Sequence, residues 1–430
     1  MRALSALCLL LTCCSAWPQS PTPQRPLLIG YITRISSGSD FDVNGVRILC
    51  GGETRIQSPA RGDASFIDMG CFRTPPVVGQ RVEVYGHRKK QPNAVVAERI
   101  DIKRIHHDDI SGWALIDAIA DPDPSAPRVV RIRADGYWMT ITPRTRVAFN
   151  DPLHSISDVM TNVWVRYSAK PGPDGTYAAQ KAKFFQNSIT ENQDAKRAKT
   201  DYDPATVPAN AKQNALAATI EGPNPKQMAP WPDEAMQHRV SAIGHKLVPS
   251  WENKLADSDP TKINFRFQVT SGHGWPLPIA LPSGVVLVPH ESVERMQNDS
   301  QLAAILADAM ACVLEKQYFR MSGANNGITA GTGTEVATIL FSPAWGAAVT
   351  SVAAKIHRDQ RQSARVSLDL MHDAGYDVDE APKAWWLLDS RKPQPLEEIA
   401  MPDRAAYLYR VLGEVWGGTP GMAQSGTGDE

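Results

Sequence analysis

The chain has 430 residues and a formal net charge of −1, because 45 lysines and arginines are balanced by 46 aspartates and glutamates. This balance argues against nucleic acid or an anionic membrane surface as the partner. Hydrophobic residues make up 42 % and charged residues 21 %, which is ordinary for a soluble globular protein. The length allows two or three domains, and we expect no transmembrane helix among them.

Residues 1–26 are predicted to direct export and then to form a flexible lead. A short positive region, an apolar stretch too short to span a bilayer and a small-residue cleavage site make residues 1–16 typical of a secretory signal peptide. We therefore expect an exported protein, in the periplasm or outside the cell. A lipoprotein anchor on Cys13 or Cys14 is the less favoured alternative. Residues 17–26 are rich in Pro and Gln and are expected to be flexible.

Residues 27–105 and 111–186 are predicted to be two copies of one small all-β module. Apolar and polar residues alternate in both segments, as in half-buried strands. Each segment also holds a dipeptide that favours a two-residue hairpin, Asn44-Gly45 in the first and Asp135-Gly136 in the second.

A short motif supports the duplication, since Thr54-Arg55-Ile56 recurs as Thr145-Arg146-Val147. The offset between the copies is roughly eighty residues, which indicates a repeated domain and not a solenoid. Each copy resembles a small β-barrel module that is common in bacterial secreted proteins. Barrels of this kind often bind ligands or partners.

Removal of the signal peptide would leave three of the six cysteines. Cys50 and Cys71 both fall in the first β module, and in an oxidising compartment we expect them to form a disulfide bond. Cys312 falls in the middle of an apolar helix, where a buried, unreactive thiol is expected.

The rest of the chain is predicted to hold a linker, a mainly α (α+β) domain and a tail. Residues 187–209 are polar and charged and are interpreted as the linker, with transient helical structure as an alternative. Residues 210–416 are predicted to form the folded domain. Residues 417–430 are rich in Gly, Ser and acidic residues, and we expect them to be disordered.

The helix predicted over residues 302–317 carries Asp308-Ala309-Met310-Ala311-Cys312 on an apolar frame that repeats at helical spacing. This frame resembles the "ELAAVLAHEIGHVLARH" helix of the HtpX-like and CAAX-prenyl-protease zinc metallopeptidases, which are gluzincins. In that motif two His side chains at i and i+4 bind zinc, and the Glu between them is the general base.

Two more segments fit the same family. Residues 277–284, Leu-Pro-Ile-Ala-Leu-Pro-Ser-Gly, resemble its edge strand, and Ala374-Gly375-Tyr376-Asp377 resembles its Gly-Tyr-Asp turn. The third zinc ligand of the family aligns with Gln360. The resemblance covers roughly residues 210–415 and implies a gluzincin-like fold.

The residues that perform the chemistry are replaced. The ligand positions are Asp308, Cys312 and Gln360, and the general-base position is Ala309, whose methyl group accepts no proton. His357 lies one helical turn before Gln360 and is a possible substitute ligand. We expect no catalytic residue, no bound metal and no cofactor.

Three hypotheses follow for the function. The first is an exported pseudo-peptidase that binds a polypeptide or a cell-envelope partner through an edge strand containing Ile279, Ala280, Leu281 and Ser283. The second is a divergent, active zinc metalloendopeptidase that uses Asp308, Cys312 and a non-standard third ligand. The third is a structural envelope protein whose β modules bind ligands.

Overall fold

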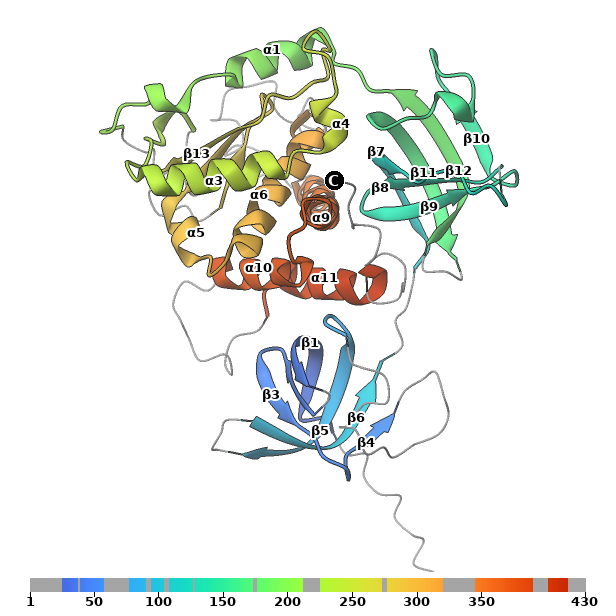
Figure 1. Ribbon diagram of the computed structural model, residues 1–430, viewed down its shortest axis with the longest axis vertical. Helices are drawn as coiled ribbons and strands as arrows, with labels where there is room; N and C mark the ends of the chain where they lie inside the picture. The colour runs from blue at the N-terminus through green and yellow to red at the C-terminus, as the bar shows by residue number, and fades with distance from the viewer. Residues whose placement is uncertain are drawn as a thin grey trace, which may run out of the picture.

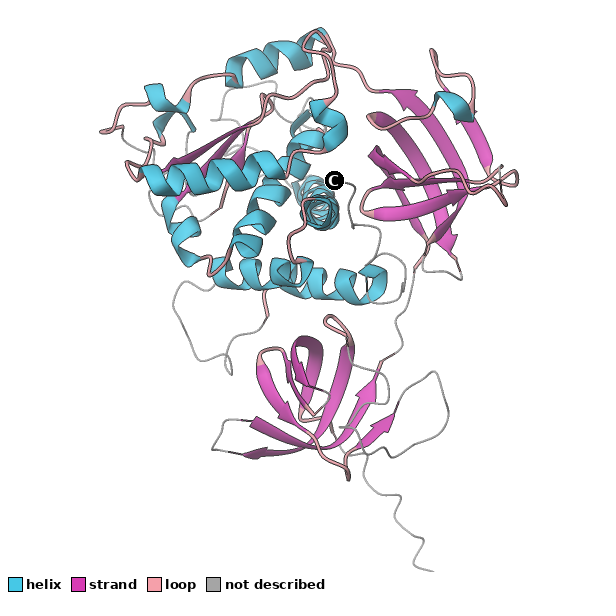
Figure 2. Ribbon diagram, in the orientation of Figure 1, coloured by secondary structure: helices cyan, strands magenta, loops and turns pink. Residues whose placement is uncertain are grey.

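Two β-barrels in the N-terminal half are followed by a helical C-terminal region (Figures 1 and 2). The predicted signal segment 1–16, Cys71 and the predicted tail 417–430 lie outside the described residues. In the long helix that begins at Trp345, the side chains are described from residue 358 onward. The computed structural model describes residues 25–37, 39–57, 77–89, 94–103, 108–126, 128–172, 176–211, 225–272, 277–319, 345–389 and 401–416.

The first barrel closes with five strands in the order β3-β2-β1-β5-β6, and β6 pairs back with β3. A short sixth strand, β4, adds to β6 in parallel. Alternate side chains point inward and form a core around Ile32, Phe41 and Ile100, as expected for strands with one buried face. The strands are β1 (Leu28–Ser37), β2 (Asp40–Val43), β3 (Val46–Leu49), β4 (Arg55–Gln57), β5 (Arg81–Lys89) and β6 (Ala94–Ile102).

The second barrel repeats this topology strand for strand, in the order β9-β8-β7-β11-β12, with β12 pairing back with β9 and β10 added to β12 in parallel. A 3-10 turn, Ile156–Asp158, precedes β11. The predicted duplication into two small β-barrels is therefore confirmed. The strands are β7 (Ile110–Ile119), β8 (Val130–Ala134), β9 (Tyr137–Ile141), β10 (Arg146–Phe149), β11 (Val163–Pro171) and β12 (Tyr177–Gln186).

The predicted hairpin turns connect equivalent strands, β2 to β3 and β8 to β9. Asn44 and Gly45 have φ values of 49° and 77°, and Asp135 and Gly136 have φ values of 59° and 75°. Positive φ at both central positions defines a type I′ turn, which explains the Asn-Gly and Asp-Gly sequences.

The repeated threonine has the same role in each barrel. Thr54 Oγ1 donates to the carbonyl oxygen of Ala97 at 2.7 Å, and Thr145 Oγ1 donates to that of Ala179 at 2.8 Å. Each threonine thus ties the start of the added strand, β4 or β10, to the last strand of its barrel.

The C-terminal region packs helices around a three-stranded sheet of order β13-β15-β14. Its strands are β13 (Arg266–Thr270), β14 (Ile279–Ala280) and β15 (Val285–Pro289), and short 3-10 turns cover Pro204–Thr206, Pro225–Gln227 and Val378–Glu380. The helices are α3 (Glu234–Lys246), α4 (Ser250–Asn253), α5 (His290–Arg295), α6 (Asp299–Leu314), α9 (Trp345–Asp373), α10 (Ala381–Asp389) and α11 (Asp403–Val411), which continues as a π-helical turn, Leu412–Trp416.

Helix α6 lies at the centre of this region and is almost wholly buried. Asn298 caps its N-terminus by accepting a hydrogen bond from the backbone N–H of Gln301 at 2.8 Å. The helix packs against α3, α9 and α10. A helix that is apolar on nearly every side is stable only in such a position.

The segment predicted to be a linker, 187–209, contains a helix, α1 (Glu191–Thr200). Thr190 and Gln193 form a capping box at its start. Arg197 donates to the backbone carbonyls of Pro260 and Lys262 at 2.6 and 2.5 Å, so the helix is docked on the C-terminal region. Its polar composition is that of a solvent-exposed helix.

Both barrels contact the helical region. Leu115 and Trp164 of the second barrel belong to the same apolar core as α6 and α9. The first barrel lies against α11, where Gly79 meets the backbone of Tyr409 and Gly413. Among the helices of the described ranges, none combines the length with the apolar character that crossing a membrane requires.

Candidate functional site

Helix α6 carries Asp308, Ala309 and Cys312 where it meets α9. Asp308 and Ala309 are buried, and Cys312 is half-buried. Asp308 forms an ion pair with Arg404, which comes from α11. The Arg404 guanidinium also donates to Ser363 Oγ at 3.3 Å and lies 3.7 Å above the ring of Trp385. A protein cation therefore neutralises the carboxylate that stands at the first ligand position of the resemblance.

Cys312 is held in a form that binds metal poorly. Burial, followed by the nearby Asp308 carboxylate, raises the pKa of the Cys312 thiol to about 12. Because only the thiolate is a good zinc ligand and nucleophile, this thiol is protonated and inert near neutral pH.

The third predicted ligand position does not join the other two. Gln360 on α9 is exposed to solvent, whereas its neighbours Asp359 and Ser363 are buried and contribute to the surroundings of Cys312. His357 lies in the same helix, but its side chain is outside the described part of the structure. Ala364, one turn after Gln360 on the same helix, is fully buried.

These donors do not fit a catalytic zinc ion. Such a site needs about three deprotonated protein ligands around an open position. Here Asp308 is paired with Arg404, Cys312 keeps its proton, and Gln360 faces solvent. Among the described residues, no group of three or more His, Cys, Asp or Glu side chains is placed to hold a metal ion.

Sequence reasoning found the positions on α6 but not the groups that surround them. Arg404 is 96 residues away from Asp308 in the chain, and no local pattern links the two. Asp359 adjoins Gln360, and its burial depends on the rotation of α9.

The predicted peptide-binding segment is only partly an edge strand. Ile279 and Ala280 form β14, which pairs with β15 at one edge of the sheet. Leu281 packs into a small core with Val285, and Ser283 donates to the carbonyl oxygen of Thr200 at 2.8 Å. The exposed edge is therefore limited to β14.

The predicted disulfide falls partly outside the described residues. Cys50 is half-buried and packs against the core of the first barrel. Cys71, its predicted partner, lies outside the described ranges. The pairing stays a prediction.

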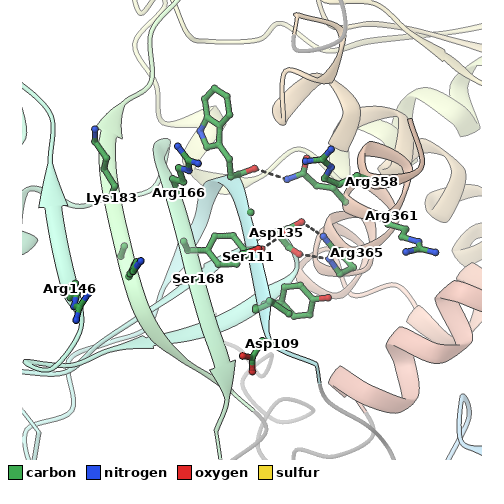
Figure 3. Close-up of a pocket in the computed structure, with 18 of the residues that line it drawn as sticks. Asp109, Ser111, Asp135, Arg146, Arg166, Ser168, Lys183, Arg358, Arg361 and Arg365 are labelled. Atoms are coloured by element: carbon green, nitrogen blue, oxygen red, sulfur yellow. Dashed lines mark hydrogen bonds and ion pairs between the residues drawn. The ribbon is translucent and has the colours of Figure 1, made fainter. Parts of the chain in front are cut away.

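A second candidate site is a cavity of about 1540 Å³ between the second barrel and α9 (Figure 3). Seven basic and three acidic residues line it, although the whole chain has a net charge of −1. The basic side chains come from β10, β11 and β12 on one wall and from α9 on the other.

Buried contacts fix the two walls relative to each other. Arg365 on α9 forms an ion pair with Asp135 in the β8–β9 turn, and its Nε donates to the Asp135 carbonyl oxygen at 2.7 Å. Tyr167 donates its hydroxyl to the same carboxylate. Gln362 donates to the carbonyl oxygen of Trp113 at 3.1 Å. The cavity is thus framed by two rigid elements.

Comparison with known proteins identifies the first barrel. Residues 29–101, which span its strands from β1 to β6, match a family described as Domain of unknown function (DUF5666). No curated protein matches the chain. The first barrel is therefore a DUF5666 domain, and that description names no activity.

Proposed function

We propose that this chain is an exported pseudo-peptidase, in which a gluzincin-like helical region has lost its reaction and acts by binding polypeptide. The observation that carries the proposal is the ion pair between Arg404 and Asp308. It places a fixed positive charge beside a family ligand position, where a zinc ion would be repelled.

The order of elements supports the assignment of the helical region. A hairpin of β14 and β15 precedes the buried helix α6, which is the order of edge strand and motif helix that the resemblance implies, and the short helix α5 lies between them. Helix α9 ends at Asp373, and Gly375 follows it with a φ of 71°, which suits the expected Gly-Tyr-Asp turn. Ala309 supplies no general base, and loss of such a base typically reduces rates by about 10²–10⁴.

The experiment is metal analysis of the purified chain after incubation with zinc, together with a hydrolysis assay on unfolded casein. We expect no stoichiometric zinc and no hydrolysis. Arg404→Ala and Ala309→Glu are the matched variants, and neither alone should give activity because each restores one missing feature. One zinc per chain with chelator-sensitive hydrolysis would instead establish the active metalloendopeptidase.

Polypeptide binding is proposed to use strand addition at β14. The Leu281 N–H donates to the Val285 carbonyl oxygen at 2.9 Å. In an antiparallel ladder bonded residues alternate, so the polar backbone groups of Ala280 point away from β15.

Ala280→Pro removes the outward N–H, whereas Ala280→Val keeps it. Capture of a permanently unfolded, carboxymethylated polypeptide should be lost in the proline variant and kept in the valine variant. Equal capture by both variants would exclude this edge, and the third hypothesis, ligand binding by the β modules, would then be favoured.

A further inference from the structure

We propose that the cavity between the second barrel and α9 is a binding site for a ligand that carries two or more phosphate groups. The inference rests on charge, register and the comparison between the two barrels, and it is independent of the helical region's loss of catalysis. Figure 3 shows Arg166 and Lys183 on neighbouring strands, with Arg358 and Arg361 on α9 across from them.

The barrel wall of the cavity places like charges directly opposite each other. Arg146 on β10 pairs in register with Lys181 on β12, and Arg166 on β11 pairs with Lys183 on β12. All four side chains are exposed. Like charges at directly opposed positions destabilise a sheet. Among the described residues no carboxylate forms an ion pair with any of the four, so the fold itself does not compensate them.

The first barrel provides an internal comparison. In each barrel the same two strands contain a bulge, after Tyr85 in β5 and after Ser168 in β11. Counted from this bulge, Arg166 in the second barrel corresponds to Glu83 in the first, and Lys183 corresponds to Asp101. Glu83 and Asp101 also face each other in register.

Those two acids are neutralised within the first barrel. Glu83 lies 2.7 Å from Lys103, and Asp101 lies 3.1 Å from Arg99. The duplicated fold therefore does not require basic residues at these positions. The second barrel has reversed the sign of both positions and has left them without a carboxylate partner in the described structure.

The opposite wall adds positive charge from α9. Arg358 and Arg361 are exposed, three residues apart, and so lie on neighbouring positions of one helical face. The Arg361 guanidinium lies 5.4 Å from the centre of the Tyr407 ring. The charges of Arg365 and Asp135 neutralise each other in their ion pair. The basic residues left to bind a ligand are therefore these two arginines and the four on the barrel wall.

The density of charge favours phosphate over carboxylate. Neighbouring strands are about 4.8 Å apart, so one tetrahedral phosphate can bridge an opposed pair of basic side chains. Arginine also matches phosphate geometry with two parallel N–H donors. A carboxylate has a single charge, and several of them would be needed to balance the six exposed basic residues of this cavity.

The test is calorimetric titration of the full chain with tripolyphosphate at low ionic strength. Citrate serves as the carboxylate probe of similar charge. A single-stranded oligonucleotide and vesicles that contain phosphatidic acid identify the source of the phosphate. The variant is Arg166→Glu with Lys183→Asp, which installs the residues that the first barrel carries and is therefore compatible with the fold.

The control is Arg131→Glu with Arg144→Asp, which changes the net charge equally at exposed positions of the same barrel outside the cavity. We expect tripolyphosphate to bind the native chain more tightly than citrate. Binding should weaken by about 10–100-fold in the cavity variant, as expected for lost charge-assisted hydrogen bonds, and by less than about twofold in the control.

The other possible results identify the source of the phosphate or overturn the proposal. Tighter binding of the oligonucleotide or of the vesicles than of tripolyphosphate would support the site and name its source. Absence of binding to all three phosphate probes would overturn the proposal. So would equal binding by the native chain and the cavity variant, or citrate binding as tightly as tripolyphosphate.

Discussion

At the scale of single residues, the contact between Arg404 and Asp308 separates this chain most clearly from a zinc peptidase. A buried carboxylate needs a partner, because removing it from water without compensation costs several kcal/mol. The motif that α6 resembles has a zinc-binding His at this position, whereas here an aspartate is paired with a guanidinium stacked on Trp385.

Cys312 should be chemically silent in the folded protein. Because burial raises the pKa of its thiol to about 12, less than about one part in 10⁴ is thiolate at pH 7.5. Iodoacetamide at pH 7.5 should therefore leave the peptide containing Cys312 unmodified unless urea is added, as measured by mass spectrometry. Rapid labelling of native protein would contradict the raised pKa.

Glu252 should make stability depend on pH. Burial raises the pKa of Glu252 from 4.5 to about 7, so the folded chain holds this proton more tightly than the unfolded chain. Stability from this group is fully present below about pH 4.5 and falls by about 3 kcal/mol as pH rises to 7. This loss of stability is measured by comparing the urea unfolding midpoint at pH 5 with the lower midpoint expected at pH 8.

Glu252→Gln keeps an acceptor for the Ile263 N–H but has no titrating proton. The difference between the two pH values should shrink in this variant. Glu234→Gln, at the exposed first residue of α3, is the control and should behave as the native chain does. An unchanged pH dependence in Glu252→Gln would mean that another group causes it.

At the scale of elements, the hairpins and the motif helix could be predicted because their determinants are local. Asn44-Gly45 and Asp135-Gly136 specify type I′ turns by themselves, and the apolar spacing of α6 specifies a buried helix. The docking of α1 on the C-terminal region could not be predicted, because it depends on long-range contacts such as those made by Arg197. The cavity could not be predicted either, because it depends on which face of α9 packs against the second barrel.

The β8–β9 turn should anchor the second barrel to α9 through charge. Asp135→Asn preserves the turn, as Asn44-Gly45 shows in the first barrel, but leaves the buried Arg365 without its counterion. Stability should fall by about 3–5 kcal/mol, the usual cost of breaking a buried pair. Urea unfolding followed by circular dichroism measures this.

Asn44→Asp is the matched control for that variant. Asn44 accepts a hydrogen bond from the Tyr31 N–H through its side-chain oxygen, which a carboxylate can also do. We expect a change below about 1 kcal/mol. Similar losses in both variants would show that the turn, and not the ion pair with α9, determines stability.

At the scale of the whole molecule, duplication has produced two barrels of one topology with different surroundings. The second barrel shares a core with the helices and frames the basic cavity. The first barrel meets the helical region at α11 and keeps a balanced set of ion pairs. The basic character of the second barrel could not be predicted from the net charge of the sequence, because that value sums the charges of both barrels and the helical region.

The first barrel should be held in place by a close backbone approach between Gly79 and Gly413. A Cβ atom at position 413 would lie 2.4 Å from the carbonyl oxygen of Gly79, which real contacts do not allow. Gly413→Ala should therefore release the barrel, at a cost of about 1–3 kcal/mol for the overpacked contact. The helical turn itself should not suffer, since alanine is the better helix former.

Small-angle X-ray scattering measures this release as a larger radius of gyration, with unchanged helical circular dichroism. Gly52→Ala, on the open surface of the first barrel, is the control and should scatter as the native chain does. Because the cavity lies at the second barrel, tripolyphosphate binding should be the same in Gly413→Ala and in the native chain. If scattering is unchanged in Gly413→Ala, contacts other than this glycine pair hold the first barrel against α11.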